Sequence, residues 1–143
     1  SKKGKFKINF GGEPTESKDA VDTDLGKIDI TTYLYEASQS KVFMVAYSDY
    51  PSSSIEATDK KELLKGSKDG FVGNLQLNID FEEFFTLDGN QGIYFKASNS
   101  EYHAAVKQIL VDNRLYQIGI LSSEGEISYN DVENFLNTFE LID

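Results

Sequence analysis

The stretch Tyr102–Ser122, with the sequence YHAAVKQILVDNRLYQIGILS, decides the fold class. Its two halves, Tyr102–Val111 and Arg114–Ser122, are rich in aliphatic residues, and only Asp112-Asn113 separates them. Two strand-like runs joined by two turn-forming residues are typical of a β-hairpin. The chain is therefore expected to contain an antiparallel sheet, and the other segments are placed around this hairpin.

A second hairpin is predicted earlier in the chain. Lys27–Tyr35 has a strand-like pattern, and a short polar loop leads from it into Val42–Tyr47. The second run is apolar on both faces, which favours a central strand covered on both sides. Further strands are expected at Phe6–Phe10, Ile79–Leu87 and Ile93–Ser98, with turn residues at 11–14 and 88–92.

A helix is predicted to begin near Asp59, whose carboxylate can cap it while Glu62 completes a capping box. Gly66, Gly70 and Gly73 lie on one stripe of this helix. Small residues would suit a close approach to the sheet. Alternatively, the helix breaks near Gly70, because glycine destabilises helix interiors.

The clearest amphipathic pattern lies at the end of the chain, in a helix expected from about Asn130, which can cap it together with Glu133. Apolar residues recur there at i, i+3, i+4 and i+7. We expect these four side chains to pack on the sheet: Val132, Phe135, Leu136 and Phe139.

The predicted order is strands, helix, strands, helix. Several strands are joined by hairpin-length turns, so the fold class is α+β, with an antiparallel sheet of about six strands flanked by helices. A length of 143 residues fits a single domain, residues 1–143. With 39% hydrophobic residues the chain can form a core of its own.

The charge excludes some partners. A net charge of −10 repels phosphate backbones and anionic membrane surfaces, so no nucleic-acid partner is expected. No apolar run approaches the roughly 20 residues that span a bilayer. Ser1 is not an initiator residue and a short polar stretch, 2–5, follows it as after a leader. We therefore expect a bacterial cell-envelope protein, periplasmic, secreted or lipid-anchored with its leader removed; a cytoplasmic location is the alternative.

No enzyme motif is present. The chain has no cysteine and one histidine, His103, so histidine-based metal sites and histidine-activated triads have little to build on. Glu82 and Glu83 are adjacent in a predicted strand and point to opposite faces. We expect no catalytic residues, no resident metal and no cofactor.

Two segments resemble calcium loops without completing them. Asp22-x-Asp24-x-Gly26 has its glycine at the fifth place instead of the sixth, and Tyr33 stands where a carboxylate is needed. Asp88-x-Asn90-x-Gly92 is adequately explained as a hairpin turn. Calcium is therefore not an expected ligand.

Tyrosines are the remaining functional material, since exposed tyrosine is favoured in interfaces. A binding patch for a basic protein partner is predicted at the end of the hairpin of Lys27–Tyr35 and Val42–Tyr47. It is formed by Tyr33, Tyr35, Tyr47, Asp49 and Tyr50. In the competing interpretation these rings pack beneath the helices. A second hypothesis places a small-molecule pocket, possibly hydrolytic or isomerase-like, between sheet and helices. A deep pocket lined by Tyr47, Tyr94 or Tyr116 with a buried carboxylate would favour it.

The order of motifs resembles the PsbP-like domain family. The resemblance rests on Phe6–Pro14, with Gly11 in place of the family's frequent proline, and on Ala46–Pro51, Asp69–Leu75, Val111–Gln117 and Phe135–Phe139. It implies a fold, an α/β/α sandwich shared with the extrinsic P subunit of photosystem II and the Ran-binding import factor of like fold. The resemblance implies no function. From the residues themselves we expect a non-catalytic binding or accessory domain.

Overall fold

The computed structural model describes residues 3–23, 26–51, 53, 55 and 59–142. Asp24, of the first calcium-like segment, and Ser52 and Ser54, near the break after Pro51, lie outside these residues. The helices and strands are β1 (Phe6–Lys7), β2 (Thr15–Thr23), β3 (Gly26–Ser38), β4 (Lys41–Asp49), α2 (Lys60–Leu75), β5 (Asn78–Leu87), β6 (Asn90–Ser98), β7 (His103–Val111), β8 (Arg114–Ser122), α3 (Tyr129–Asn134), the 3₁₀ turn η1 (Leu136–Thr138) and β9 (Glu140–Leu141).

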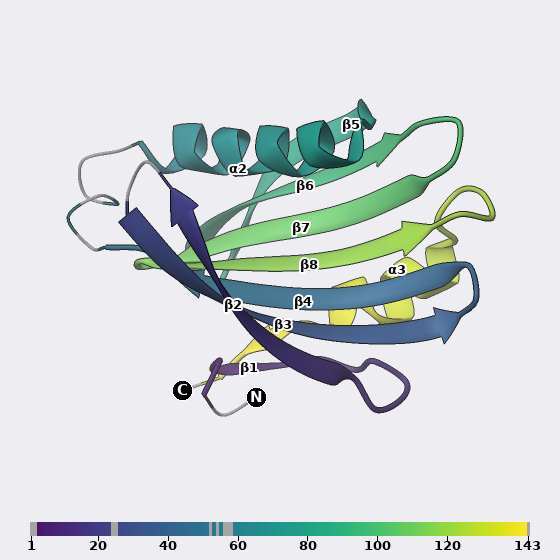
Figure 1. Ribbon diagram of the computed structural model, residues 1–143, viewed down its shortest axis with the longest axis horizontal. Helices are drawn as coiled ribbons and strands as arrows, with labels where there is room; N and C mark the ends of the chain where they lie inside the picture. The colour runs from purple at the N-terminus through teal and green to yellow at the C-terminus, as the bar shows by residue number, and fades with distance from the viewer. Residues whose placement is uncertain (1–2, 24–25, 52, 54, 56–58, 143) are drawn as a thin grey trace.

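Seven strands form one antiparallel sheet in the order β2-β3-β4-β8-β7-β6-β5. Strands β2 to β4 follow one another as hairpins, and so do β5 to β8. The chain passes from β4 through α2 to β5, which lies at the far edge of the sheet (Figure 1). Strands β6, β7 and β8 then follow toward the centre, where β8 pairs with β4. The central position predicted for Val42–Tyr47 is confirmed, because β4 lies between β3 and β8. The expected cover on both sides is only partial, since Val42, Met44 and Ala46 on one face are half-buried.

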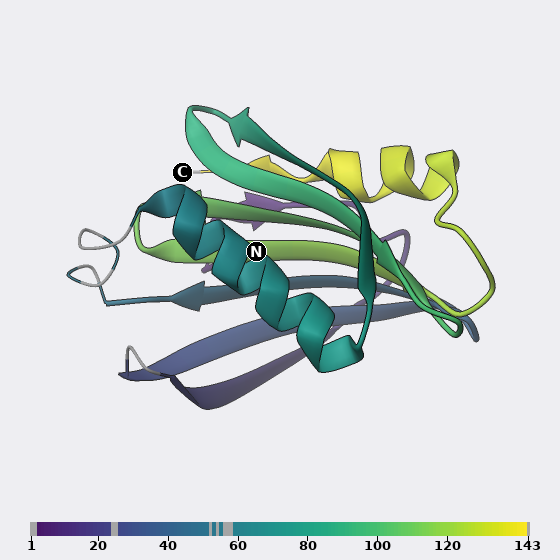
Figure 2. The same cartoon turned by 90° about the horizontal axis from the view of Figure 1, so that it is seen from above.

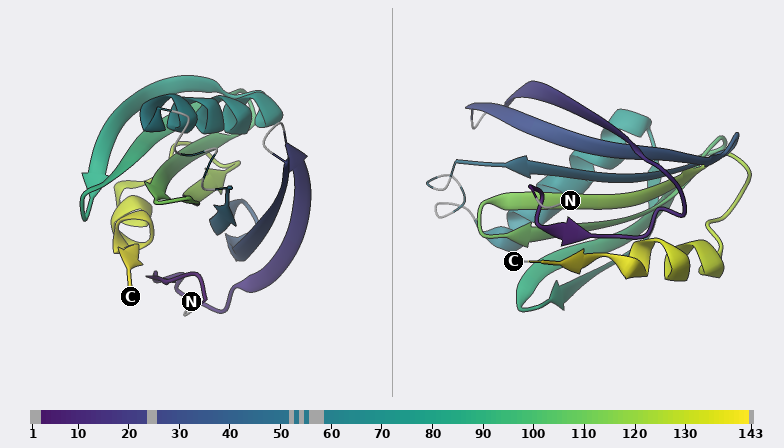
Figure 3. Two further views of the ribbon diagram at one scale, coloured as in Figure 1. Left: turned by 90° about the vertical axis from the view of Figure 1, so that its left-hand side faces the viewer. Right: turned by 90° about the horizontal axis from the view of Figure 1, so that it is seen from below.

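Two layers cover the sheet. Helix α2 contacts β6 and β7 on one face, and a core cluster that includes Leu64, Phe95 and Val106 lies beneath it. On the other face lie α3, η1 and the small two-stranded sheet of β1 and β9, over a cluster that includes Phe43 and Ile118. Figures 2 and 3 show the helices on opposite sides of the strongly twisted strands. The predicted α+β class and α/β/α arrangement are confirmed.

The strand count is higher than expected, because β2 was missed. Its sequence, TESKDAVDT, has no alternation of apolar residues. As an edge strand it has no buried face, and its residues 15–22 are all exposed. A pattern search for half-buried strands cannot detect such a segment.

The predicted strand Phe6–Phe10 is also corrected. Only Phe6–Lys7 is a strand, and it pairs with β9 outside the main sheet. The apolar side of the segment is nevertheless buried: Phe6 and Phe10 belong to the core, with Ile8 packed against it. The alternation found in the sequence thus indicated a buried face correctly and a sheet position wrongly.

The C-terminal helix is shorter than predicted. Helix α3 ends at Asn134, and Phe135 leaves helical geometry with φ −121° and ψ −67°. Ser128, not Asn130, is its cap, accepting a hydrogen bond from the Asp131 N–H. The expected packing holds nonetheless: Phe135, Leu136 and Phe139 are buried in the core, and Val132 packs against it. The 3.6-residue spacing therefore identified the buried side chains of a segment that is only partly helical.

Helix α2 is continuous, so the break considered near Gly70 does not occur. Asp59 caps it as predicted, accepting from the Lys61 N–H at 3.4 Å. The packing reason proposed for the glycines is wrong, because Gly66, Gly70 and Gly73 are exposed and a Cβ added to any of them would meet nothing within 4 Å.

Candidate functional site

Hydrogen bonds from β8 and from the C-terminal segment hold the N-terminal segment, residues 3–10, in place. The Tyr116 hydroxyl donates to the Gly4 carbonyl, and Arg114 Nη1 donates to the Lys3 carbonyl at 3.1 Å. The Ile142 N–H donates to the Lys5 carbonyl, and the Asn9 N–H to Thr138 Oγ1, both at 3.0 Å. Because these bonds come from β8 and the C-terminal segment, the position of residues 3–10 is fixed by parts of the chain more than 100 residues away.

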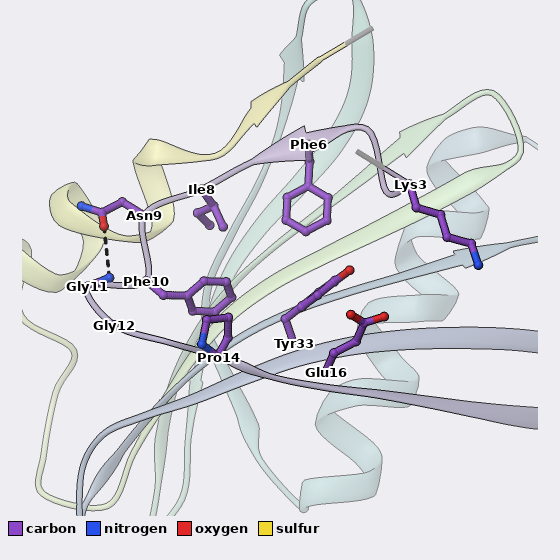
Figure 4. A pocket seen from close by; sticks show the side chains of 10 residues that line it. All are labelled: Lys3, Phe6, Ile8, Asn9, Phe10, Gly11, Gly12, Pro14, Glu16 and Tyr33. Carbon is purple, nitrogen blue, oxygen red and sulfur yellow. Dashed lines mark hydrogen bonds between the residues drawn. The ribbon is translucent and has the colours of Figure 1, made fainter. Parts of the chain in front are cut away.

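A cleft of about 700 Å³ lies between this segment and the start of the β2–β3 hairpin (Figure 4). Phe6, Ile8 and Phe10 form the wall from the N-terminal segment, and Tyr33 of β3 lies opposite. The remaining lining residues are Lys3, Asn9, Gly11, Gly12, Pro14 and Glu16. The cleft is therefore mixed in character, with rings on its walls and charged or backbone groups at its margins.

Cross-strand pairing brings the polar groups of the cleft together. Glu16 lies directly opposite Tyr33 in the β2–β3 register, so the two side chains share a face of the sheet. The Tyr33 ring in turn meets Phe6 edge to face, with centroids 5.7 Å apart. The Phe6 and Phe10 rings are 2% and 8% exposed and form the back of the cleft, while Tyr33 and Glu16 lie nearer its opening. A site with an apolar back and polar groups in front suits a ligand with both apolar and polar parts.

The turn that closes the cleft depends on glycine. Gly11 has φ 80°, a left-handed conformation, and its N–H donates to Asn9 Oδ1 at 3.1 Å. A Cβ added to Gly12 would overlap the Tyr35 ring and its hydroxyl. The turn predicted at these two residues is confirmed, and it lets the chain pass close over Tyr35.

A second, smaller cleft of about 470 Å³ shares Lys3 with the first and lies beside Arg114. The Arg114 guanidinium donates from Nε and Nη2 to the two Asp49 oxygens, at 2.6 and 2.8 Å, and its carbon lies 4.6 Å from the centre of the Tyr47 ring. The hydrogen bond to Asp49 raises the pKa of Arg114. Because the Arg114 guanidinium is bound to the Asp49 carboxylate, this ion pair stabilises the structure and does not form an open anion site.

The structure divides the predicted tyrosine patch. Tyr33 lines the large cleft, and Tyr35 packs nearby with its ring 6.4 Å from Phe43. Tyr47 shares their face of the sheet but is only 5% exposed. Tyr50 packs against the cluster under α2, on the opposite face. These residues therefore do not form one continuous surface, and their binding role stays a prediction.

Asp49 is partly exposed and carries the ion pair with Arg114 described above. The sequence-based prediction missed the cleft residues Phe6, Phe10, Pro14 and Glu16. One signal was present in the sequence: Phe6, Ile8 and Phe10 alternate, so their side chains must face something apolar. What they face, the β2–β3 hairpin, depends on long-range contacts that no local pattern contains.

Three tyrosines have raised pKa values. Burial is the main cause at Tyr50, Tyr94 and Tyr116, because it disfavours the phenolate. Of the three tyrosines expected to line a pocket between sheet and helices, Tyr47 lines the second cleft, beside Arg114. The Tyr116 ring is in the core and Tyr94 meets Phe81 edge to face, and neither lines the two clefts described above. These raised pKa values are therefore consequences of packing.

The polar groups do not assemble a metal site in the part of the chain that the structure describes: no three His, Asp or Glu side chains are close enough to hold an ion. His103 begins β7 and borders a small cleft with Asp80 and Ser98, whose hydroxyl donates to Asp80 Oδ2 at 2.5 Å. In the second calcium-like segment, the Asn90 amide donates to the Leu87 carbonyl, as expected for a hairpin turn. None of the described helices is long and apolar enough to cross a membrane.

Comparison with solved structures identifies the fold. The chain superimposes on cyanobacterial PsbP from Synechocystis, a solution structure, with a TM-score of 0.61 and 11% identity over 99% of this chain and 89% of that one. The fold is PsbP-like. A crystal structure from Bacteroides thetaiotaomicron is similar at TM-score 0.43 and 13% identity, over 97% of this chain and 46% of that chain. No family model and no curated protein matches the sequence.

The PsbP-like resemblance expected from the sequence is thus confirmed at the level of fold. At 11% identity the likeness gives the arrangement of strands and helices and nothing about ligands.

Proposed function

We propose that this chain is a non-catalytic binding domain that holds an extended segment of a partner protein in the cleft between residues 3–14 and the β2–β3 hairpin. The observation that carries the proposal is the cleft of about 700 Å³ with Phe6, Phe10 and Tyr33 in its walls. Aromatic anchors beside polar margins are the usual make-up of protein-binding hot spots.

The fixed position of the N-terminal segment, residues 3–10, supports a binding function more than a catalytic one. Four hydrogen bonds hold it in place, so the cleft is formed before a ligand arrives. A preformed site loses little entropy when it binds, which favours affinity. The groups lining the cleft that can transfer protons are Lys3, Glu16 and Tyr33.

Charge points to the nature of the partner. The chain has a net charge of −10, and an acidic protein attracts a basic partner over long distances. The charges in the clefts themselves are mixed, because Lys3 lines the large cleft with Glu16, and Lys18 and Arg114 line the neighbouring one with acidic residues. The expectation of a basic partner therefore rests on the net charge of the chain. We therefore propose a segment that combines an aromatic or aliphatic anchor with lysine or arginine.

A small-molecule ligand is the second candidate. The cleft volume falls within the range of about 300–1,000 Å³ that is usual for such sites. The Glu16–Tyr33 pair would then supply the polar contacts. In contrast to the sequence-based hypothesis, this pocket lies between the sheet and the N-terminal segment and not between sheet and helices.

The test is selection of peptides from a displayed library on the purified chain, followed by affinity measurements on the best peptide. Glu16→Lys and Tyr33→Ser should each weaken binding by about tenfold or more, because each removes a group from the cleft. Tyr129→Ser is the matched control, since Tyr129 is 75% exposed on α3, outside the cleft. Peptides that bind all three variants equally would contradict the proposal, and fragments that shift NMR signals of residues 8–16 instead would favour the small-molecule candidate.

A further inference from the structure

The two edge strands of the sheet differ in what they expose. Strand β2 presents mainly polar side chains, with Val21 its one large exposed apolar residue among positions 15–22. Strand β5 exposes Ile79, Phe81 and Phe84, which are 37%, 43% and 40% accessible. Proteins usually protect a sheet edge with charge, so a long edge with exposed aromatic residues indicates a pairing surface.

The apolar side chains of β5 lie on both faces of the sheet. Phe84 faces α2, where Lys61 Nζ lies 5.3 Å from the centre of its ring. Phe81 and Phe85 lie on the other face: Phe81 meets Tyr94 edge to face at 5.9 Å, and Lys107 Nζ lies 5.5 Å from the Phe85 ring. A strand added at this edge would find apolar contacts for both of its alternating sets of side chains.

Two of the three carboxylates of β5, Glu82 and Glu83, have lysines of the same chain near them, and the third, Asp80, accepts a hydrogen bond from the Ser98 hydroxyl. Glu82 forms an ion pair with Lys68 of α2. Burial lowers the pKa of Lys107, while the charges of Glu133 and Glu83 oppose that effect, so Glu83 lies close to a cation as well. The local charge of the strand is therefore reduced, although the whole chain is strongly acidic.

The sequence of β5 is self-complementary in one antiparallel register. Pairing centred on Phe84 places Phe84 opposite itself, Glu83 opposite Phe85, Glu82 opposite Thr86 and Phe81 opposite Leu87. Centring the pair on Glu83 or Glu82 instead would place that carboxylate opposite its own copy, which is destabilising. At the Phe84 register Glu82 and Glu83 lie opposite Thr86 and Phe85, and Asp80 falls opposite Asp88, which lies in the turn beyond β5.

From these contacts we infer that β5 is the pairing surface of a homodimer, in which two copies of this chain join edge to edge about Phe84. The contact is isologous and closes on itself, as expected for a twofold dimer. In this dimer the sheet is continuous across both protomers. The cleft at residues 3–14 takes no part in the contact, so dimerisation does not depend on the proposed partner binding.

Sedimentation equilibrium of the intact chain tests the dimer. We expect a monomer–dimer equilibrium that tightens as salt increases, because protomers of charge −10 repel each other less when screened. Phe81→Lys and Phe84→Lys should each weaken dimerisation by about tenfold or more. Val21→Lys, on the β2 edge, is the matched control and should leave it unchanged.

Cysteine crosslinking tests the register, and the natural chain contains no cysteine to interfere. Directly opposite residues in an antiparallel pair have Cα atoms about 4.5–5.5 Å apart, within reach of a disulfide. Phe84→Cys should therefore crosslink to its copy under mild oxidation much faster than Thr86→Cys or Val21→Cys. A chain that stays monomeric at its highest soluble concentration, with equal crosslinking rates at the three positions, would overturn the inference, even if peptides bind the cleft.

Discussion

Arg114 and Tyr116 are two residues apart on β8 and together hold the N-terminal segment. Arg114 connects Asp49, the Lys3 carbonyl and the Tyr47 ring, and Tyr116 holds the Gly4 carbonyl. Gly4 has no room for a side chain, since a Cβ there would lie 2.8 Å from the Tyr47 ring. The cleft therefore depends on contacts between individual residues far apart in the sequence.

Tyr116→Phe tests this attachment through pH. In the native chain Tyr116, Tyr50 and Tyr94 have pKa values raised chiefly by burial, so their stabilising effect is complete below about pH 10, the pKa of an unfolded tyrosine. It is lost as the pH rises through the higher folded-state values. Lys107, whose pKa is lowered by burial, contributes in the opposite sense.

We expect urea unfolding of the native chain to show stability falling above about pH 10. Tyr116→Phe should cost about 1 kcal/mol at pH 7, through the lost hydrogen bond to Gly4, and should reduce the alkaline fall. Tyr129→Phe, at an exposed position, should behave as the native chain does. Identical alkaline slopes for the native chain and Tyr116→Phe would show that this phenol does not contribute.

At the scale of elements, the local sequence pattern predicted the amphipathic segments and the strands that a tight turn joins. The hairpins of β3–β4 and β7–β8 were predictable because each strand carries its own apolar residues and its own turn. Asp112, with φ 54°, supplies the turn conformation that the pair Asp112-Asn113 predicts. Strand β2 was not predictable, because its pairing partner β3 determines it and its own side chains do not.

The cleft, too, could be predicted from the sequence only in part. Its apolar residues could be found by alternation at Phe6, Ile8 and Phe10, whereas its position required the bonds from Arg114, Tyr116 and Thr138. The tyrosine patch was assembled from strand alternation alone, and it did not allow for Tyr50 turning to the opposite face. Alternation gives the face of a residue only while the strand continues, and β4 ends at Asp49.

Helix α2 offers a test at the same scale. Gly66 and Gly70 lie in its interior with open space where a Cβ would be, so alanine should fit without strain. Gly66→Ala and Gly70→Ala should each stabilise the chain by about 0.5–1 kcal/mol, measured from denaturation midpoints.

Gly92→Ala is the contrasting variant for that test. Its Cβ would lie 2.8 Å from the Gln108 carbonyl oxygen and 2.6 Å from the Phe85 ring, so it should destabilise. If alanine at 66 or 70 destabilised as well, the exposed glycine face of α2 would have to make contacts absent from the monomer.

At the scale of the whole molecule, the chain presents two separate surfaces on a PsbP-like frame. The cleft lies at the β2–β3 side of the sheet and the exposed edge β5 lies at its far end, as the strand order requires. Occupation of one therefore leaves the other accessible. A dimer formed through β5 would present two clefts, one in each protomer, to the same basic partner. Binding of one cleft would then raise the effective concentration of the partner at the other. The cell-envelope location expected from the sequence stays a prediction.

The central claim, that the cleft holds a segment of a partner protein, is tested most directly by photo-crosslinking in the organism that makes the chain. A benzophenone amino acid placed at Glu16 should give a discrete adduct with another protein, and the adduct should disappear when Tyr33 is also changed to Ser. The same photo-reactive residue at Tyr129, which is exposed on α3, should give no such adduct. No adduct from position 16, or the same adduct from both positions, would contradict the claim.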